Sequence, residues 1–170
     1  AAAGARQDLP RGARFLPARI ASITAQTRRL AEIIVLDDAS DDDSLAVLEG
    51  LRAASPVPMR IIPNAVKSGS VSRQWLRGME LATTPLVWIA EADDLSEPRF
   101  LESLLPLFDD PGTVMAYAQS KMIDAEGQVT APDYLGYTQD IDPLLWRQDY
   151  RRAGQEEIAA ALAVKNTIPN

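Results

Sequence analysis

Two apolar runs of this 170-residue sequence end in carboxylates, and these acids are the residues best suited to chemistry. The run EIIVLDD ends with Asp37 and Asp38, and the run VWIAEADD ends with Glu91, Asp93 and Asp94. Like charges this close repel one another, and a buried carboxylate is costly unless a cation neutralises it. Mg²⁺ or Mn²⁺ commonly takes one or two carboxylates together with substrate phosphates. The spacing therefore favours a divalent-cation site completed by a phosphate-bearing ligand, and the alternative is that these acids only cap helices and end strands.

The rest of the composition restricts the chemistry to carboxylates. The sequence has no cysteine and no histidine, so it offers no thiol nucleophile, imidazole base or cysteine–histidine zinc site. A formal net charge of −7 argues against a nucleic-acid partner, because such binding needs a basic face. No apolar run reaches the roughly 18 residues that predict a membrane span, and no signal-peptide pattern is present. A cytoplasmic protein is the default expectation.

Positive charge is concentrated at the start of the chain. Residues 1–30 contain one acid, Asp8. They contain six arginines: Arg6, Arg11, Arg14, Arg19, Arg28 and Arg29. An arginine-rich amphipathic start faces either an anionic surface or solvent. We interpret it as a solvated helix face, and peripheral contact with a membrane stays open.

The elements that position the acids alternate between strands and helices. Strands are predicted for EIIVLDD and for residues 59–62, 86–90 and 113–119. Helices are predicted for residues 16–29, 44–54, 70–83, 97–108 and 155–164. This alternation predicts an α/β fold with a doubly wound, mostly parallel sheet and helices on both faces. Because the carboxyl ends of parallel strands share one edge, the two acidic groups are expected to approach each other there.

The chain opens with a helix, whereas a doubly wound domain usually opens with a strand. We therefore expect a partial or truncated domain. Residues 1–14 lack an apolar period and are predicted to be an extension or linker. Residues 15–128 form the predicted α/β domain, and residues 129–170 are predicted to be a connection leading away from it.

A loop with anion-binding features precedes the helix predicted at 70–83. Its sequence, NAVKSGSVSRQW, places Lys67 and Gly69 before the helix and Arg73 in the first turn. Backbone N–H groups at a helix N-terminus attract anions, and basic side chains add charge. The alternative is a simple N-cap with solvated basic residues, since the spacing of a P-loop is absent.

In combination, EIIVLDDAS, the N-x-x-K-S-G-S loop and WIAEADDLSEP resemble the family 2 glycosyltransferases, over about residues 15–128. The resemblance implies a GT-A, Rossmann-like fold that binds a nucleotide-diphosphate sugar. It implies that Asp38, with Asp37 beside it, contacts the nucleoside.

The same resemblance implies further roles at the second acidic run and the loop. Asp93 would coordinate a divalent cation that bridges the diphosphate, with Asp94 and Glu91 flanking it. Arg73, with Lys67 nearby, would reach the nucleotide or its phosphates. Glu91 departs from the family, which usually has aspartate there. No acid in the tail matches the family's catalytic base, so no catalytic residue is assigned.

The expected function is a glycosyltransferase of hexosyltransferase type. It would move a sugar to a hydroxyl of a glycan or lipid-linked acceptor by metal-assisted inverting displacement, with residues 129–170 beginning the acceptor-binding region. Two alternatives stay open: a non-catalytic, transferase-like binding domain and a phospho-receiver signalling domain. The sequence identifies neither the nucleotide nor the sugar.

Overall fold

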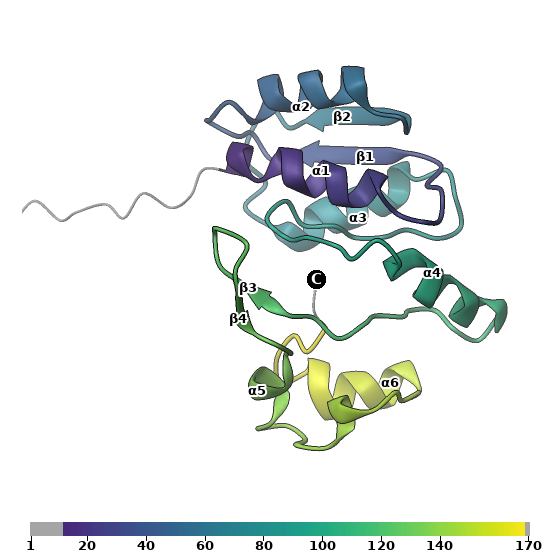
Figure 1. Cartoon of the computed structure of the whole chain (residues 1–170). Coiled ribbons are helices and arrows are strands. Elements are labelled where there is room, and N and C mark those ends of the chain that lie inside the picture. Colours follow the sequence, from purple (N-terminus) through teal and green to yellow (C-terminus); the bar gives the residue numbers. More distant parts are fainter. Residues whose placement is uncertain (1–11, 169–170) are drawn as a thin grey trace, which may run out of the picture. The chain divides into compact units, whose positions relative to one another are not determined.

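The computed structural model describes residues 12–168, so Arg6, Arg11 and most of the predicted extension lie outside the described residues (Figure 1). The chain divides into two compact units, one up to Ser103 and one from Leu104 onward. The domain boundary predicted at residue 128 is drawn between a nucleotide-sugar-binding part and an acceptor-binding part. It does not coincide with the division between these two units, and it stays a prediction.

A parallel pair of strands forms the sheet of the first unit. Strand β1 (Ile33–Asp37) pairs with β2 (Met59–Pro63) in a register that sets Ile33 opposite Met59 and Asp37 opposite Pro63. Helix α2 (Ser44–Ala54) connects them, which is the crossover that parallel neighbours require. Consecutive β-branched and aliphatic residues in β1 suit a strand that is covered on both faces. The predicted α/β class with a parallel sheet is therefore confirmed.

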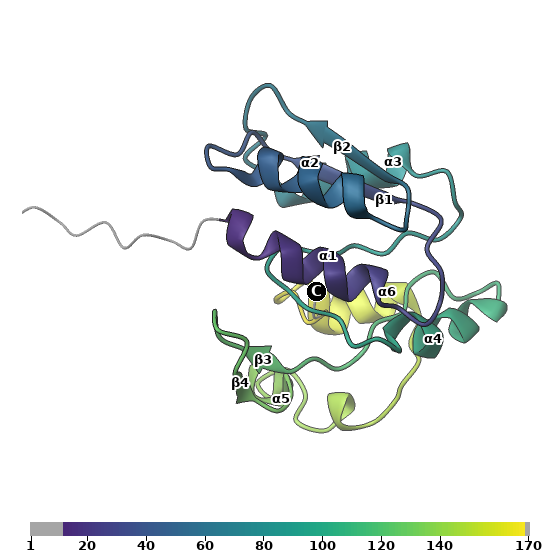
Figure 2. The ribbon, with the colours of Figure 1, turned by 45° about the horizontal axis from the view of Figure 1, so that its top comes forward.

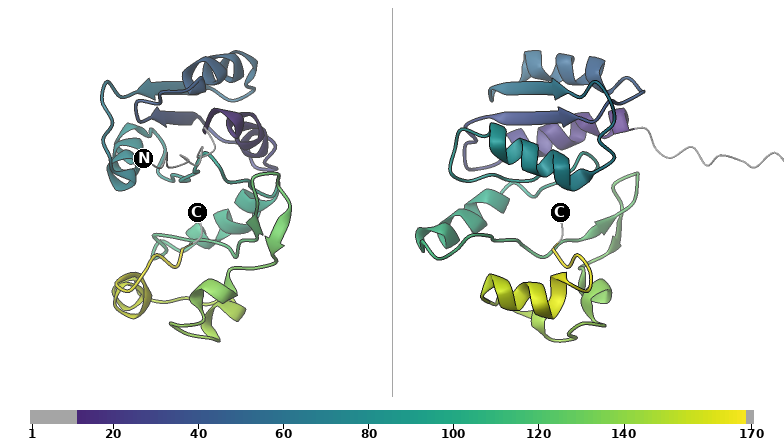
Figure 3. Two further views of the ribbon diagram at one scale, coloured as in Figure 1. Left: turned by 90° about the vertical axis from the view of Figure 1, so that its left-hand side faces the viewer. Right: turned by 180° about the vertical axis from the view of Figure 1, so that it is seen from behind.

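Helices cover both faces of this sheet. Helix α1 (Leu16–Thr24) follows a short 3₁₀ turn, Gly12–Arg14, and contacts α2 on one face. Helix α3 (Val71–Leu81) packs on the opposite face, against β1 (Figures 2 and 3). A Cβ added at Gly78 would lie 3.4 Å from Leu36 Cδ1, so glycine at this position lets α3 approach the strand closely. The predicted two-sided covering is confirmed.

The core of the first unit lies between α1 and the sheet. Ile20 and Ile23 of α1 are buried against Ile33 and Met59 of the two strands. Trp88 and Ala90 also pack against this cluster. The segment that carries the second acidic run is therefore held by the same core as β1.

Two of the predicted strands are wrong. Within residues 12–168, neither 86–90 nor 113–119 belongs to a sheet. An apolar run predicts burial, but a strand also needs a neighbouring backbone with which to form a ladder. Trp88 shows the outcome for the first segment, which joins the core without joining the sheet.

Several predicted helices are shorter than expected. Helix α1 ends at Thr24 instead of residue 29. The helix predicted at 97–108 is helix α4 (Phe100–Leu104) followed by a 3₁₀ turn, Leu105–Asp109. Pro106 accounts for this change, because proline lacks an N–H and disfavours the α conformation of the residue before it.

The second unit contains a small hairpin and short helical segments. Strand β3 (Met122–Ile123) pairs antiparallel with β4 (Val129–Ala131). The turn predicted at 123–127 is confirmed, with Gly127 at a φ of 80° and its N–H donating to Asp124 O over 3.0 Å. The remaining helical segments are α5 (Leu135–Thr138), a 3₁₀ turn Leu145–Arg147, α6 (Gly154–Glu157) and a π-helical turn Ile158–Leu162. The last two together run from residue 154 to residue 162 and so nearly coincide with the helix predicted at 155–164.

A buried carboxylate, that of Glu157, accepts hydrogen bonds from two side chains of the second unit. Glu157, 6% exposed, accepts hydrogen bonds from Tyr150 Oη over 2.9 Å and from Arg152 over 3.1 Å. The hydroxyl of Tyr150 also contacts that of Tyr117, to which Trp146 Nε1 donates over 3.3 Å. Burial, followed by the hydrogen bonds to Tyr117 and Glu157, raises the pKa of Tyr150 above its ordinary value.

Candidate functional site

The first acidic pair lies where β1 ends. Asp37 is the last residue of the strand, is 5% exposed, and accepts the N–H of Ser40 over 3.1 Å. Its own carbonyl accepts the N–H of Asn64 over 2.8 Å, which continues the pairing of β1 with β2 by one residue. Ala39 adopts a left-handed φ of 58°, so the chain turns sharply at this edge. Asp38 is thereby placed beside the segment that follows β2.

Asp38 is held by four donors from that segment and from α3. Its Oδ1 accepts from Asn64 Nδ2 over 2.5 Å, from Ser68 N over 2.8 Å and from Gln74 Nε2 over 3.1 Å. Its Oδ2 accepts from Ser68 Oγ over 2.9 Å. The backbone N–H of Ser68 lowers the pKa of Asp38 most, and the side chains of Asn64 and Ser68 act in the same direction. The carboxylate is therefore ionised at neutral pH and ties the loop to the end of β1.

The loop runs from residue 64 to residue 70 and enters α3 through a conventional cap. Ser70 accepts the N–H of Arg73 over 3.4 Å, and Gly69 takes a φ of 64° that favours glycine. Lys67 and Arg73 are exposed, so their charges face solvent at the helix N-terminus. This placement agrees with an anion-binding loop and equally with solvated basic residues.

Sequence reasoning missed the side chains that fix this loop. Asn64, Ser68 and Gln74 contact Asp38 directly, and Arg77 donates to Asn64 Oδ1. Helical spacing could have pointed to Arg77, because it lies one turn after Arg73 on the same face of α3. The candidate site therefore includes both the acid and a layer of polar side chains behind it.

The second acidic group forms a turn after the segment 86–90. Asp93 is exposed, while Glu91 and Asp94 are half-buried. Burial raises the pKa of Asp94; the charge of Arg19 opposes this, and the charges of Asp93 and Glu91 add to it. The positive charge of Arg19 therefore favours the ionised form of Asp94, against the effect of burial.

Arg19 is not on a solvated helix face, and that prediction is wrong for this residue. It is only 3% exposed, and its guanidinium donates to Ser96 Oγ over 2.7 Å. The guanidinium carbon lies 5.5 Å from the ring centroid of Trp88, within cation–π range. The long aliphatic part of arginine allows such burial when the charged end finds partners. Sequence periodicity, which treats arginine as polar, gave no signal for it.

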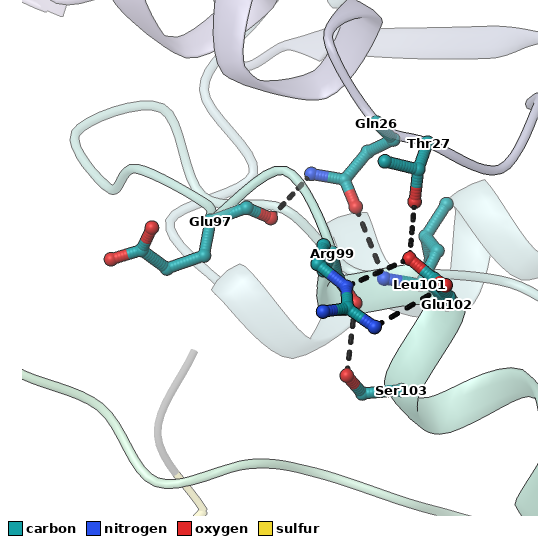
Figure 4. Close-up of polar contacts among 7 residues, drawn as sticks. All are labelled: Gln26, Thr27, Glu97, Arg99, Leu101, Glu102 and Ser103. Carbon is teal, nitrogen blue, oxygen red and sulfur yellow. Dashed lines mark hydrogen bonds and ion pairs between the residues drawn. The ribbon is translucent and has the colours of Figure 1, made fainter.

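The segment after the acidic turn is also fixed by two residues that follow α1, Gln26 and Thr27 (Figure 4). Gln26 donates to Glu97 O over 2.8 Å and accepts the N–H of Leu101 over 3.0 Å. Thr27 donates its N–H to Pro98 O over 2.9 Å and its hydroxyl to Glu102 over 3.0 Å. The turn that follows α1 therefore holds the acid-bearing segment on its carboxyl-terminal side.

The two acidic groups have separate partners in the structure. Asp38 is bound to the 64–70 loop, whereas Arg19 binds Ser96, two residues after Asp94. Within residues 12–168, no group of three or more acidic side chains is placed to hold a metal ion by itself. In the same residues, no helix is long and apolar enough to cross a membrane.

Comparison with known proteins identifies the family. Residues 11–161 match the model of glycosyl transferase family 2. The chain belongs to this family. The resemblance stated from the sequence is thereby confirmed, and with it the GT-A, Rossmann-like class of the fold. Glycosyl transfer is the activity after which this family is named.

Two curated relatives of this family 2 chain carry the name of uncharacterized glycosyltransferases. The uncharacterized glycosyltransferase alr2836 of Nostoc sp. is 30% identical over 114 residues, which are 66% of this chain and 34% of the relative. The uncharacterized glycosyltransferase YibD of Escherichia coli is 26% identical over 150 residues, which are 77% of this chain and 43% of the relative. The chain thus spans less than half the length of either relative. No solved structure matches it.

Proposed function

We propose that this chain binds the nucleotide-diphosphate sugar of an inverting, metal-assisted glycosyltransferase. The observation that carries the proposal is the ionised Asp38, held by four hydrogen bonds at the carboxyl edge of a parallel sheet. In open α/β sheets, ligands bind beyond this edge. A fixed negative charge there suits the N–H and hydroxyl donors of a nucleoside.

Asp38 can bind a ligand although its carboxylate already accepts four hydrogen bonds. The hydrogen bond from Gln74 Nε2, at 3.1 Å, is the longest of the four. A nucleoside donor replaces it at least cost, while Ser68 and Asn64 keep the carboxylate in place. Asp37 supports Asp38 from the end of β1, and Lys67 and Arg73, exposed at the start of α3, attract the diphosphate.

The second acidic group suits a divalent cation that arrives with the nucleotide. Such a cation needs only one or two carboxylates besides the phosphate oxygens, and the exposed Asp93 with the half-buried Asp94 supplies that set of hard oxygen donors. Glu91 adds negative charge next to them. When bound, the cation would offset the charge that develops on the departing diphosphate.

The transfer step itself is proposed for the complete enzyme. An acceptor hydroxyl of a glycan or lipid-linked sugar forms a bond to the anomeric carbon and gives its proton to a carboxylate. The bond from that carbon to the diphosphate oxygen breaks, and the nucleoside diphosphate leaves with the electron pair. This displacement inverts the anomeric configuration. No residue of this chain is assigned as the base.

Calorimetric titration of the chain with UDP, GDP and dTDP, each with Mn²⁺ and again with a chelator, tests the proposal. We expect one nucleotide to bind in the presence of Mn²⁺ and to lose most of its affinity in the chelator. Nucleotide binding with the same affinity in Mn²⁺ and in chelator would contradict the proposed site, as would the absence of nucleotide binding by a folded sample. Donor hydrolysis measured in the same samples separates a transferase from a non-catalytic binding domain.

A further inference from the structure

A cavity of about 380 Å³ lies at the amino edge of the parallel sheet. It is lined by side chains between residues 24 and 30, which precede β1, and by residues 56–58, which precede β2. The two parallel strands begin side by side, with Ile33 opposite Met59, whereas Asp38 follows the other end of β1. The volume lies in the range of small-molecule sites, about 300–1,000 Å³. The proposed function assigns no role to this cavity.

Hydrogen bonds fix both walls of the cavity. Pro58 O accepts the N–H of Ile33 over 2.8 Å, which joins the segment before β2 to the start of β1. Ser55 Oγ donates to Val57 O over 2.7 Å and accepts the N–H of Val57 over 3.2 Å. On the opposite wall, Gln26 is 9% exposed and is held by the contacts in Figure 4. A ligand would therefore meet a cavity that is already formed.

Two guanidinium groups line this cavity and lack partners of their own. Arg28 and Arg29 are exposed, and within residues 12–168 neither forms an ion pair or a side-chain hydrogen bond. The other polar side chains of the lining are already engaged. Thr24 donates its hydroxyl to Ile20 O over 2.9 Å, and the amide of Gln26 donates to backbone carbonyls. The donors left for a ligand are therefore those of the two arginines.

One carboxylate close to Arg28, that of Glu102, is bound by other residues. It accepts hydrogen bonds from Arg99 Nε and from Thr27 Oγ1, each over 3.0 Å. These hydrogen bonds lower the pKa of Glu102 most, and the charge of Arg28 contributes least. Glu102 therefore pairs with Arg99, and the charge of Arg28 stays available to a ligand.

The lining combines positive charge with an apolar wall. Leu30, Val57 and two prolines supply the apolar part. The planar guanidinium of arginine matches the oxygens of a phosphate group. A phosphate monoester carries a charge of about −1.5 to −2 at neutral pH, which two guanidinium groups offset. In a chain with a net charge of −7, such a pair of unpartnered arginines in one cavity favours a specific anion.

We propose that this cavity binds a small phosphate monoester, with the phosphate on Arg28 and Arg29 and an apolar part of the ligand against Leu30 and Val57. The site is separate from the proposed nucleotide site and needs no divalent cation, so either proposal can fail without the other. A soluble phosphate ester and the headgroup of a membrane lipid present the same chemistry, and the experiment distinguishes these two sources.

Calorimetric titration of the whole chain with phenyl phosphate and with inorganic phosphate, in a metal-free buffer, tests the charge and the apolar wall. We expect the Kd for phenyl phosphate to be at least fivefold lower than that for inorganic phosphate, because only the ester also contacts the apolar wall. In Arg28→Gln/Arg29→Gln the Kd for phenyl phosphate should rise at least tenfold. The Tm should not change, since both side chains are exposed.

Arg14→Gln/Arg147→Gln is the matched control, because it removes two exposed arginines that lie outside the cavity. It should bind phenyl phosphate like the unchanged chain. Equal Kd values in the two double variants would overturn the proposal, and equal Kd values for the two probes would overturn the assignment of an ester. In NMR spectra, phenyl phosphate should shift amide signals of residues 24–33. Shifts confined to residues 64–73 would place the anion at the start of α3 instead and overturn the site.

Cosedimentation with vesicles separates the two sources. The vesicles contain phosphatidylcholine with phosphatidic acid, whose headgroup is a phosphate monoester, and vesicles of phosphatidylcholine alone are the blank. Binding to phosphatidic acid that requires Arg28 and Arg29, without binding of phenyl phosphate, supports a lipid headgroup. Binding of phenyl phosphate without cosedimentation supports a soluble ester. A folded chain that binds neither probe overturns the proposal.

Discussion

Asp38 accepts hydrogen bonds from both the backbone N–H and the hydroxyl of Ser68, over 2.8 and 2.9 Å and across 30 residues of sequence. The first joins the carboxylate to the backbone of the loop, and the second fixes the side chain of the same residue. The loop that leads into α3 is therefore fastened to the end of β1 before any ligand arrives. Such pre-organisation spares a ligand the cost of ordering the loop.

Replacing Asp38 should change how stability depends on acid pH. Hydrogen bonds, first that of the Ser68 backbone, hold the folded-state pKa of Asp38 below its ordinary value. Their contribution is fully present above the unfolded-state pKa of about 3.9 and is lost as the pH falls through the lower folded-state value. Asp38→Asn removes this titration, so we expect lower stability at neutral pH and a smaller further loss in acid. Urea unfolding midpoints across the acid range measure both.

The control for this experiment is Asp41→Asn. Asp41 is exposed on the loop after β1, and its replacement should leave the acid dependence of the unchanged chain. An Asp38→Asn variant with the original acid dependence would show that the carboxylate does not fasten the loop.

The elements of the first unit were predictable where the local pattern and the tertiary contacts agree. EIIVLDD forms β1 because its apolar residues meet β2 on one side and helices on both faces. The run ending at Ala90 is also wholly apolar but has no ladder partner within the described residues. Local pattern therefore predicts that a segment is buried, whereas pairing depends on which backbone lies beside it.

The candidate site was predictable in its acids and not in their partners. Asp38 and Asp93 stand out because carboxylates follow apolar runs. Arg19 does not stand out, because its burial depends on Ser96, 77 residues away. Gln26 reaches Leu101 across 75 residues for the same reason. Contacts of this range leave no period in the sequence, so the groups that position the acids emerge only from the fold.

Leu48 should be the most sensitive aliphatic position of α2. It is 2% exposed, whereas Leu45 on the same helix is 36% exposed. Leu48→Ala leaves a cavity and should lower the free energy of unfolding by about 2–5 kcal/mol. Leu45→Ala, the matched control, should cost about 1 kcal/mol or less, because part of its side chain already faces water. Urea unfolding of the two variants measures the difference, and equal losses would place Leu48 outside the core.

Tyr150 should make the second unit sensitive to alkaline pH. Burial and its contacts with Tyr117 and Glu157 raise its folded-state pKa. The stabilising contribution is fully present below the unfolded-state pKa of about 10 and is lost as the pH rises toward the folded-state value. Tyr150→Phe should reduce this alkaline loss, and at neutral pH should cost about 1 kcal/mol because Glu157 loses one donor.

Urea unfolding followed from neutral to alkaline pH measures the effect of Tyr150→Phe. Tyr137→Phe is the control, since Tyr137 is 42% exposed and its replacement should leave the alkaline loss unchanged. If both variants lose stability in alkali as steeply as the unchanged chain, the hydroxyl of Tyr150 does not bind Glu157 in solution.

Asp93 should control metal-dependent nucleotide binding without controlling stability. Its carboxylate is exposed next to the half-buried Asp94, so Asp93→Asn removes a cation ligand and leaves the core intact. We expect the Kd for the nucleotide that binds with Mn²⁺ to rise at least tenfold, about 1.4 kcal/mol, with an unchanged urea midpoint. Glu80→Gln, which removes an exposed charge from α3, should bind like the unchanged chain and thereby controls for net charge.

In chelator, Asp93→Asn and the unchanged chain should bind the nucleotide equally weakly, because the lost carboxylate acts only through the cation. Unchanged affinity of Asp93→Asn in Mn²⁺ would remove Asp93 from the site, and a tenfold loss that persists in chelator would mean that the carboxylate contacts the nucleotide directly.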